Sequence, residues 1–143
     1  MDNKLIKEAT SNLELIDIHL YSSEISRFED IYQDHYPDDM SQETDVNLSA
    51  ELAELKNGRK TLKVKASLSA IYKQDDRSLS IIKATFLAVY NIYDDISEEA
   101  ISEFVRHNSL HNVWPFWREH AYRMSAEAKL PRPHIALQKP ISS

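Results

Sequence analysis

The chain has 143 residues, about the size of one ordinary domain, and a formal net charge of −6 from 17 Lys and Arg against 23 Asp and Glu. This balance argues against nucleic-acid binding, which needs a basic surface to neutralise phosphates. The absence of cysteine excludes disulfides, thiolate metal sites and Cys nucleophiles, and a single glycine excludes glycine-rich phosphate loops. No apolar run approaches the roughly 20 residues that span a bilayer. We therefore expect one domain over residues 1–143, cytoplasmic and without membrane insertion, with residues 1–12 and 138–143 flexible.

The first half of the chain predicts a strand and a long crossover. Alternation from Leu13 to Tyr21 predicts a strand in which Ile16, Ile18 and Leu20 share one face. An acidic segment, Ser22–Thr44, follows and retains several large apolar side chains, namely Ile25, Phe28, Ile31, Tyr32, Tyr36 and Met40. A connection of this length inside a compact domain is usually functional or disordered.

The middle of the chain predicts a three-stranded meander over residues 46–52, 62–72 and 79–93. Asn57-Gly58 predicts the first hairpin turn, with both residues at positive φ. The last of the three strands is apolar on both sides, which predicts that both of its faces are covered. A helix would cover one face, and a second helix or the sheet of another subunit would cover the other.

The end of the chain changes to helical spacing. Ser97 predicts the N-cap of a helix with an apolar stripe at Ile101, Phe104 and Val105. A polar break at His107–Asn112 ends this helix, and Asn112 caps a second one that stops at Leu130-Pro131. The predicted fold is therefore α+β: an antiparallel four-stranded sheet with a long crossover after the first strand and two C-terminal helices on one face.

The sequence offers no convincing catalytic set. His107 and His111 lie four residues apart, as a helical metal pair would, but the HEXXH pattern is absent and a helix end is expected between them. A solvated helix end is the plainer interpretation. No Ser occupies a G-x-S-x-G turn, and the carboxylates are scattered. We predict no catalytic residue, no metal ligand and no cofactor; a small antiparallel-sheet enzyme remains only as an alternative.

Aromatic side chains carry the functional signal. Trp114, Trp117 and Met124 fit the core side of the last helix, whereas Phe116 and Tyr122 point elsewhere. Aromatics left outside the core by the helix and the crossover form an exposed apolar patch, which usually marks a binding surface or a subunit interface. The alternative is that the crossover folds back and merely covers the sheet. The candidate binding residues are Phe28, Ile31, Tyr32, Tyr36, Phe116 and Tyr122.

The segment NVWPFWRE, Asn112–Glu119, resembles the helix opening N-[IV]-x-FPYARE of the SecB export-chaperone family. Leu130-Pro131 followed by residues 135–137 is similar to the family's FPxLxLxP segment, and Asp17-Ile18 stands where the family has a D-I-S-F-E strand. The predicted order of elements is also the family's order. The resemblance covers about residues 13–140, and only the C-terminal motif is specific.

The resemblance implies an ATP-independent holdase that forms dimers and homotetramers and holds unfolded polypeptide in apolar grooves. The six candidate residues would then bind the client. Two further partners are implied, the SecA motor of protein export or an antitoxin. The family's acidic residue late in the third meander strand, part of the SecA-binding surface, is not evident here, and Lys83 lies in that region. A dedicated chaperone of a toxin–antitoxin pair therefore stays open beside an export factor. A third alternative is an interaction module whose aromatics only build its own oligomer.

Overall fold

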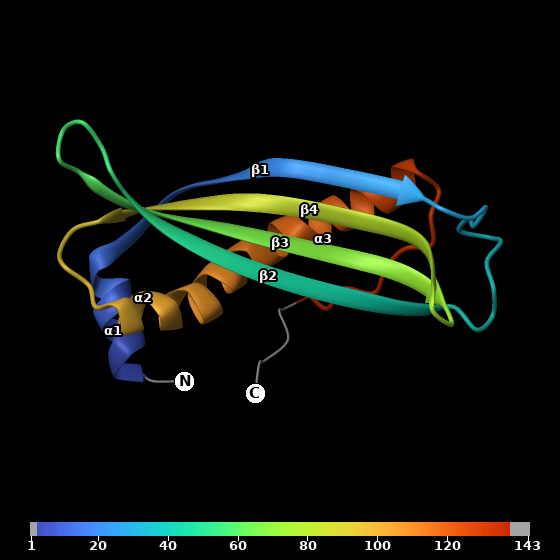
Figure 1. Cartoon of the computed structure of the whole chain (residues 1–143), viewed down its shortest axis with the longest axis horizontal. Helices are drawn as coiled ribbons and strands as arrows, with labels where there is room; N and C mark the ends of the chain where they lie inside the picture. The colour runs from blue at the N-terminus through green and yellow to red at the C-terminus, as the bar shows by residue number, and fades with distance from the viewer. Residues whose placement is uncertain (1–2, 138–143) are drawn as a thin grey trace.

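The computed structural model describes residues 3–137 (Figure 1), so the predicted flexibility of residues 1–2 and 138–143 lies outside the described residues. The elements are α1 (Asn3–Asn12), β1 (Leu13–Arg27), β2 (Ser41–Glu54), β3 (Lys60–Gln74), β4 (Arg77–Ile92), α2 (Glu98–Phe104), a π-helical turn (Val105–Ser109) and α3 (Leu110–Glu127). The four strands form one antiparallel sheet in the order β1-β4-β3-β2. The α+β class and the long crossover after the first strand are confirmed.

The core lies between the sheet and α3, which runs diagonally across one side of the sheet (Figure 1). Because strand side chains alternate between faces, β3 and β4 present every second residue to the helix. These residues are almost all buried, among them Leu62, Val64, Ala66, Leu68, Ala84, Phe86, Ala88 and Tyr90. Trp114 and Trp117 of α3 are buried against them and Met124 is partly buried, so the predicted core role of all three is confirmed.

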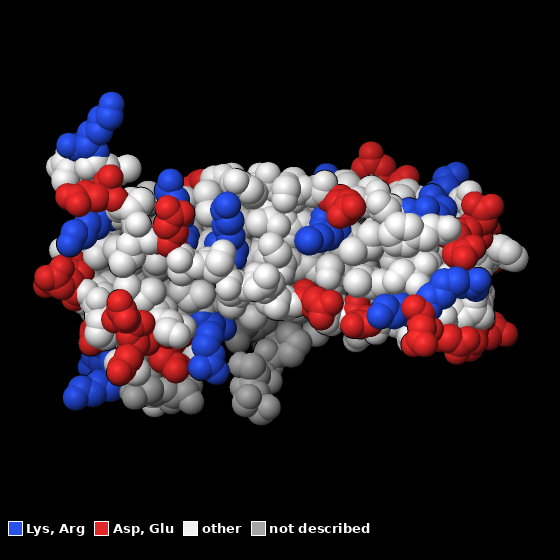
Figure 2. Space-filling model, viewed as in Figure 1, with Lys and Arg blue, Asp and Glu red and all other residues white. Residues whose placement is uncertain are grey.

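The opposite side of the sheet carries no helix of the described residues. There Ile81, Leu87 and Val89 of β4 are only partly buried. The second cover that the apolar pattern of β4 predicts is therefore not supplied by residues 3–137. In Figure 2 the charged side chains of the viewed face gather mainly toward its two ends, and uncharged atoms fill much of the surface between them.

Two bulges change which side chains of β1 face the helix. The pairing with β4 shifts between Leu15 and Asp17 and again between Leu20 and Ser22. Each bulge adds a residue and inverts the alternation that follows it. The predicted face with Ile16, Ile18 and Leu20 was therefore wrong at Ile16. The residues paired with helix-facing positions of β4 include Leu15, Ile18, Leu20, Ser23 and Ile25.

The hairpin between β2 and β3 is where Asn57-Gly58 predicts it, but its turn type differs. Gly58 has φ 83°, whereas Asn57 has no positive φ, so the prediction for Asn57 was wrong. The Gly58 amide donates to the Leu55 carbonyl (2.8 Å), and the Asn57 side chain accepts from the Arg59 amide (2.9 Å). The loop is a three-residue turn closed by a left-handed glycine, a common alternative to the two-residue turn.

The predicted break at His107–Asn112 was wrong, because α2 continues into α3 through the π-helical turn. Ser97 is the N-cap as predicted, and its hydroxyl accepts from the Ala100 amide at 3.2 Å. Asn112 caps nothing; its amide donates to the Tyr90 hydroxyl at 3.0 Å. A π turn contains an additional residue, so the buried positions Phe104 and Ser109, five apart, both face the sheet.

Helix α1 is an element that the sequence analysis did not predict. It packs beside α2 (Figure 1), and its Ala9 is fully buried. Glu8 accepts hydrogen bonds from the amide and hydroxyl of Ser97, at 2.9 and 3.1 Å. A helix this short is marginal alone, so these contacts with α2 stabilise it.

Within residues 3–137 both outer strands have one unpaired side, since β1 pairs there only with β4 and β2 only with β3. Strand β2 pairs with β3 along its full length without a register shift, from Ser41 opposite Lys73 to Glu54 opposite Lys60. No helix in residues 3–137 is long and apolar enough to cross a membrane.

Candidate functional site

The crossover comprises residues 28–40, shorter than predicted, because β1 extends to Arg27 and β2 begins at Ser41. Tyr32 and His35 bond each other's backbone in both directions, at 2.8 and 3.0 Å, which folds the crossover into a tight turn. Phe28, Tyr32 and Tyr36 are 40 to 57% exposed. Ile31 is 3% exposed and belongs to the core, so its side chain anchors the crossover and does not contribute to the exposed surface.

Arg27 fastens the crossover to the end of α3. Its Nε donates to the Ile31 carbonyl (3.0 Å), and its Nη2 donates to the Ala128 carbonyl (2.6 Å). The guanidinium carbon also lies 4.6 Å from the centroid of the Tyr32 ring, a cation–π distance. One side chain therefore holds β1, the crossover and the helix end together and orients an exposed ring.

A hollow of about 440 Å³ lies beside the crossover. Its lining combines apolar side chains with an acidic and basic rim, comprising Glu29, Asp30, Ile31, His35, Tyr36, Pro37, Gln74, Arg77 and Leu79. Arg77 and Glu29 form an ion pair at 3.4 Å across it.

The helix-facing side of β1 is a second exposed apolar region. Helix α3 packs mainly on β4 and β3 and meets β1 at Ser23. Leu15, Leu20 and Ile25 therefore remain 39 to 45% exposed although they face the helix side. Phe116 is also exposed, and its ring lies 6.5 Å from Phe86, whose strand partner is Leu20. We call Leu15, Leu20, Ile25 and Phe116 the β1 strip.

Tyr122 is partly buried and bonded at its hydroxyl. The hydroxyl donates to the Ile135 carbonyl (2.9 Å) and accepts from the Ile135 amide (3.2 Å). The guanidinium carbons of Arg118 and Arg132 lie 4.6 and 4.1 Å from the ring centroid. Burial raises the pKa of Tyr122, but the bond to Ile135 and the two guanidiniums outweigh it and bring the pKa below its ordinary value. This ring is therefore less available for contact than the crossover rings.

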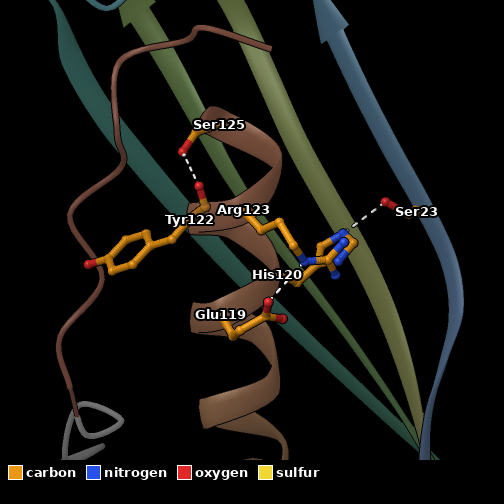
Figure 3. A network of polar contacts seen from close by, with 6 residues as sticks. All are labelled: Ser23, Glu119, His120, Tyr122, Arg123 and Ser125. Carbon is orange, nitrogen blue, oxygen red and sulfur yellow. Dashed lines mark hydrogen bonds and ion pairs between the residues drawn. The ribbon is translucent and has the colours of Figure 1, made fainter. Parts of the chain in front are cut away.

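His120 of α3 reaches Ser23 of β1 (Figure 3). Its Nε2 lies 2.9 Å from the Ser23 hydroxyl, and its ring meets Phe86 edge-on at 5.9 Å. Burial lowers the pKa of His120, and the nearby Arg123, itself paired with Glu119 at 2.9 Å, lowers it further. His120 is therefore neutral near pH 7 and links helix and strand as an uncharged partner.

The lowered pKa of His120 predicts a pH-dependent stability. Below about pH 6.5 the unfolded chain binds a proton at this residue that the native chain does not, so the free energy of unfolding should decrease as the pH falls from 7 toward 5. His120→Gln can keep a hydrogen bond to Ser23 and should make this decrease shallower. Urea unfolding at several pH values measures it.

The exposed His111 provides the matched control. His111→Gln should leave the pH dependence as in the wild type. An unchanged slope in His120→Gln would show that His120 does not govern acid stability.

The segment after α3 returns along the helix and ties it to β2. Leu130 and Ile135 are buried. The Trp114 indole donates to the Ala136 carbonyl (2.9 Å). Gln42 of β2 donates to the His134 carbonyl (2.9 Å) and accepts from its amide (2.7 Å). The helix-facing side is thus partly covered toward β2, while the β1 strip stays open.

Within residues 3–137 no group of three or more His, Asp or Glu is placed to hold a metal ion. His107 lies 3.3 Å from a carboxylate oxygen of Glu103 on the preceding turn. The exposed side chains of the crossover and of the β1 strip can instead make contacts through apolar surface and aromatic rings.

No family model and no curated protein sequence matches the chain. Among solved structures, the Mycobacterium tuberculosis SecB-like chaperone Rv1957, solved in complex with a ChAD peptide from the Rv1956 HigA1 antitoxin, superposes with a TM-score of 0.71. The match covers 94% of this chain and 96% of that chain at 14% sequence identity. The chain has the SecB-like fold. The resemblance carried by Asn112–Glu119 is thereby confirmed at the level of the fold.

A second solved structure with a related fold is a protein of unknown function from Streptococcus agalactiae. Its TM-score is 0.54, and the match covers 87% of this chain and 97% of that chain at 12% identity. Chains with very low sequence identity therefore share this arrangement of sheet and helix.

Sequence reasoning found Phe116 but missed the other residues of the β1 strip, Leu15, Leu20 and Ile25, and the role of Arg27. Leu15 and Leu20 could have been noticed, because apolar residues occur on both alternating faces of this strand. Nothing local to Arg27 indicates that it reaches Ala128, 101 residues away.

Proposed function

We propose that the protein is an ATP-independent chaperone that binds non-native polypeptide through exposed apolar side chains. The observation that carries this proposal is the exposure of Phe28, Tyr32, Tyr36 and the β1 strip on a domain whose core is otherwise well buried. Such patches on a folded protein mark interaction surfaces. The SecB-like fold supports the same function.

The chemistry needs no nucleotide. An unfolded chain presents scattered apolar segments. Burying these segments against aromatic rings removes apolar surface from water, which is favourable without ATP hydrolysis. Tyr and Phe supply large contact areas with few rotatable bonds, so little conformational entropy is lost on binding. Because ordering the client opposes binding, many weak contacts must act together, which favours presentation on an assembled homo-oligomer, a dimer or a tetramer.

More specifically, we propose that the protein is the dedicated chaperone of a toxin–antitoxin pair. The Mycobacterium tuberculosis structure contains an antitoxin peptide, and we extend this to an antitoxin segment as the client of the present protein in the cytoplasm. The export role with SecA is the second candidate, favoured only by the resemblance of Asn112–Glu119.

The test is suppression of aggregation of a denatured client without nucleotide. The wild type should keep the client soluble at roughly equal molar amounts. The double variant Phe28→Ala/Tyr32→Ala should need about tenfold more protein, because it loses two rings worth about 1 kcal/mol each, not fully additive. Light scattering at 360 nm follows the aggregation.

Tyr93→Ala is the matched control, since Tyr93 is an exposed ring outside the proposed surface. It should retain wild-type activity, and native sizing should show the same assembly for all three proteins. Dissociation of the double variant would favour the interaction module, and no suppression by the assembled wild type would refute the chaperone.

A further inference from the structure

The two halves of the crossover are fastened to the rest of the chain in different ways. Its first half is fixed by buried or partly buried contacts, through Ile31 in the core and through Arg27. The amide of Gln33 also donates to a carbonyl at the end of α3 (2.9 Å). Residues 36–39, by contrast, have one hydrogen bond to another element within residues 3–137, and it comes from a side chain. The position of the second half therefore depends on the side chains that meet it from the sheet.

Those side chains come from the hairpin between β3 and β4. Gln74 and Arg77 pair across the two strands and flank a two-residue turn, in which Asp75 has φ 55°. Nη2 of Arg77 donates to Oε1 of Gln74 (2.7 Å), and Nε2 of Gln74 donates to Oδ1 of Asp39 (2.9 Å). Nη1 of Arg77 lies 3.4 Å from a carboxylate oxygen of Glu29. The chain of contacts Glu29–Arg77–Gln74–Asp39, which we call the latch, thus joins both ends of the crossover to one hairpin.

The latch also brings a positive charge to a segment that has no Lys or Arg. Residues 28–40 contain five carboxylates, Glu29, Asp30, Asp34, Asp38 and Asp39. Arg77 is the Arg that lines the hollow of about 440 Å³ beside the crossover, together with Glu29 and Asp30. Because like charges repel, the carboxylates would drive the crossover apart if this cation were removed. Arg77 therefore holds the crossover by attraction as well as by its hydrogen bond.

Every link of the latch is exposed to solvent. The side chains of Arg77 and Glu29 are 61% and 43% exposed, and both hydrogen bonds of Gln74 lie at the surface. Exposed ion pairs add little to the stability of a fold and are weakened further by salt. The latch can therefore control the position of residues 36–39 without deciding whether the domain folds.

We propose that Arg77 and Gln74 are positioning residues for client binding, which hold the second half of the crossover so that the hollow beside it keeps its shape. Tyr36 and Pro37 line this hollow together with Leu79, so the lining changes when the latch opens. A preformed site loses less conformational entropy on binding than a mobile one, and the closed latch therefore strengthens binding. This inference rests on the proposed function.

The experiment measures binding of an uncharged peptide to the full chain by fluorescence anisotropy. The probe is a 12-residue peptide of Ser, Asn, Leu and Phe with a neutral dye, so it carries no charge that salt could screen. Its affinity for the wild type should fall about two- to threefold between 0.05 and 0.5 M NaCl, because salt opens the latch. Arg77→Ala should bind the peptide about three- to fivefold more weakly at 0.05 M, with no further weakening at 0.5 M.

Three further variants separate the latch from a general effect of substitution. Arg77→Lys keeps a cation for Glu29, but its single nitrogen cannot also serve Gln74 as the guanidinium fork does, so its affinity should be intermediate. The exchange Glu29→Arg/Arg77→Glu restores an ion pair with the charges reversed and should bring the affinity to within about twofold of the wild type. Arg59→Ala is the matched control and should behave as the wild type, since Arg59 is exposed at the β2–β3 turn and forms no ion pair within residues 3–137.

Hydrogen exchange tests the latch without a client. The Met40 amide, which donates to the Pro37 carbonyl (3.2 Å), should exchange faster in Arg77→Ala than in the wild type. Thermal unfolding should show that both proteins fold. Faster exchange together with weaker, salt-independent binding supports the positioning role.

Two kinds of failure can be told apart. Equal affinity of Arg77→Ala and the wild type at 0.05 M NaCl, or unchanged exchange at Met40, would overturn the positioning role and leave the chaperone proposal standing. No binding of the peptide by the wild type would overturn the chaperone proposal and the positioning role with it.

Discussion

Trp117→Ala is expected to lower the free energy of unfolding by about 3–5 kcal/mol, the usual cost of truncating a buried aromatic residue. Trp117 is 2% exposed and packs between α3 and the sheet. The truncation leaves a cavity that rigid strands cannot fill. Since domains of this kind are stable by about 5–15 kcal/mol, the variant should unfold at a much lower urea concentration.

Phe116 gives the matched control one residue earlier on the same helix. It is 48% exposed, so Phe116→Ala should change stability by no more than about 1 kcal/mol. It should weaken client binding instead, because Phe116 belongs to the β1 strip. A similar loss of stability in both variants would contradict the assignment of one ring to the core and the other to the surface.

Arg27→Ala is expected to lower the free energy of unfolding by about 2–4 kcal/mol and to loosen the crossover. The change removes two hydrogen bonds from a charged donor, each worth about 1.5–3 kcal/mol. It leaves the carbonyls of Ile31 and Ala128 without the donor that Arg27 supplies. Hydrogen exchange should become faster at the amides of Tyr32 and His35, whose mutual bonds depend on the turn that Arg27 holds.

Arg27→Lys distinguishes the hydrogen-bond geometry from the charge. Lysine retains the cation over Tyr32 but cannot reach both carbonyls with a planar fork, so exchange and stability should lie between those of the wild type and Arg27→Ala. Wild-type behaviour of Arg27→Lys would show that charge alone fastens the crossover.

The sheet could be predicted because β3 alternates regularly from Leu62 to Tyr72 and a second long apolar strand follows from Leu79. The departures occur where one residue is added to a regular element. The bulges at β1 inverted the assigned face of Ile16, and the π turn concealed the continuity of α2 and α3. Such insertions are decided by long-range packing, which a local pattern does not contain. Helix α1 escaped prediction for the same reason, since its stability comes from α2.

The binding surface was partly foreseeable. Phe28, Tyr32, Tyr36 and Phe116 are exposed, as large apolar residues on a connection or on the outer side of a helix tend to be. Ile31 lies between exposed neighbours yet is buried, because the course of a crossover is not periodic. Tyr122 is bonded to Ile135 and lies beneath the guanidinium of Arg132. The sequence pattern does not indicate that residues 132–135 return along the helix.

The two edge strands of the sheet, β1 and β2, affect whether copies of the protein can polymerise without limit. If any edge strand of one copy could pair with any edge strand of another, the sheets would join edge to edge into filaments. Two β2 strands laid side by side would bring their acidic rows, Glu43, Asp45 and Glu51, against one another, which is unfavourable. The irregular backbone of β1 breaks the even spacing that indiscriminate pairing requires. The two edges therefore differ enough to oppose unlimited growth, although apolar side chains such as Leu15 and Leu20 stay exposed on β1.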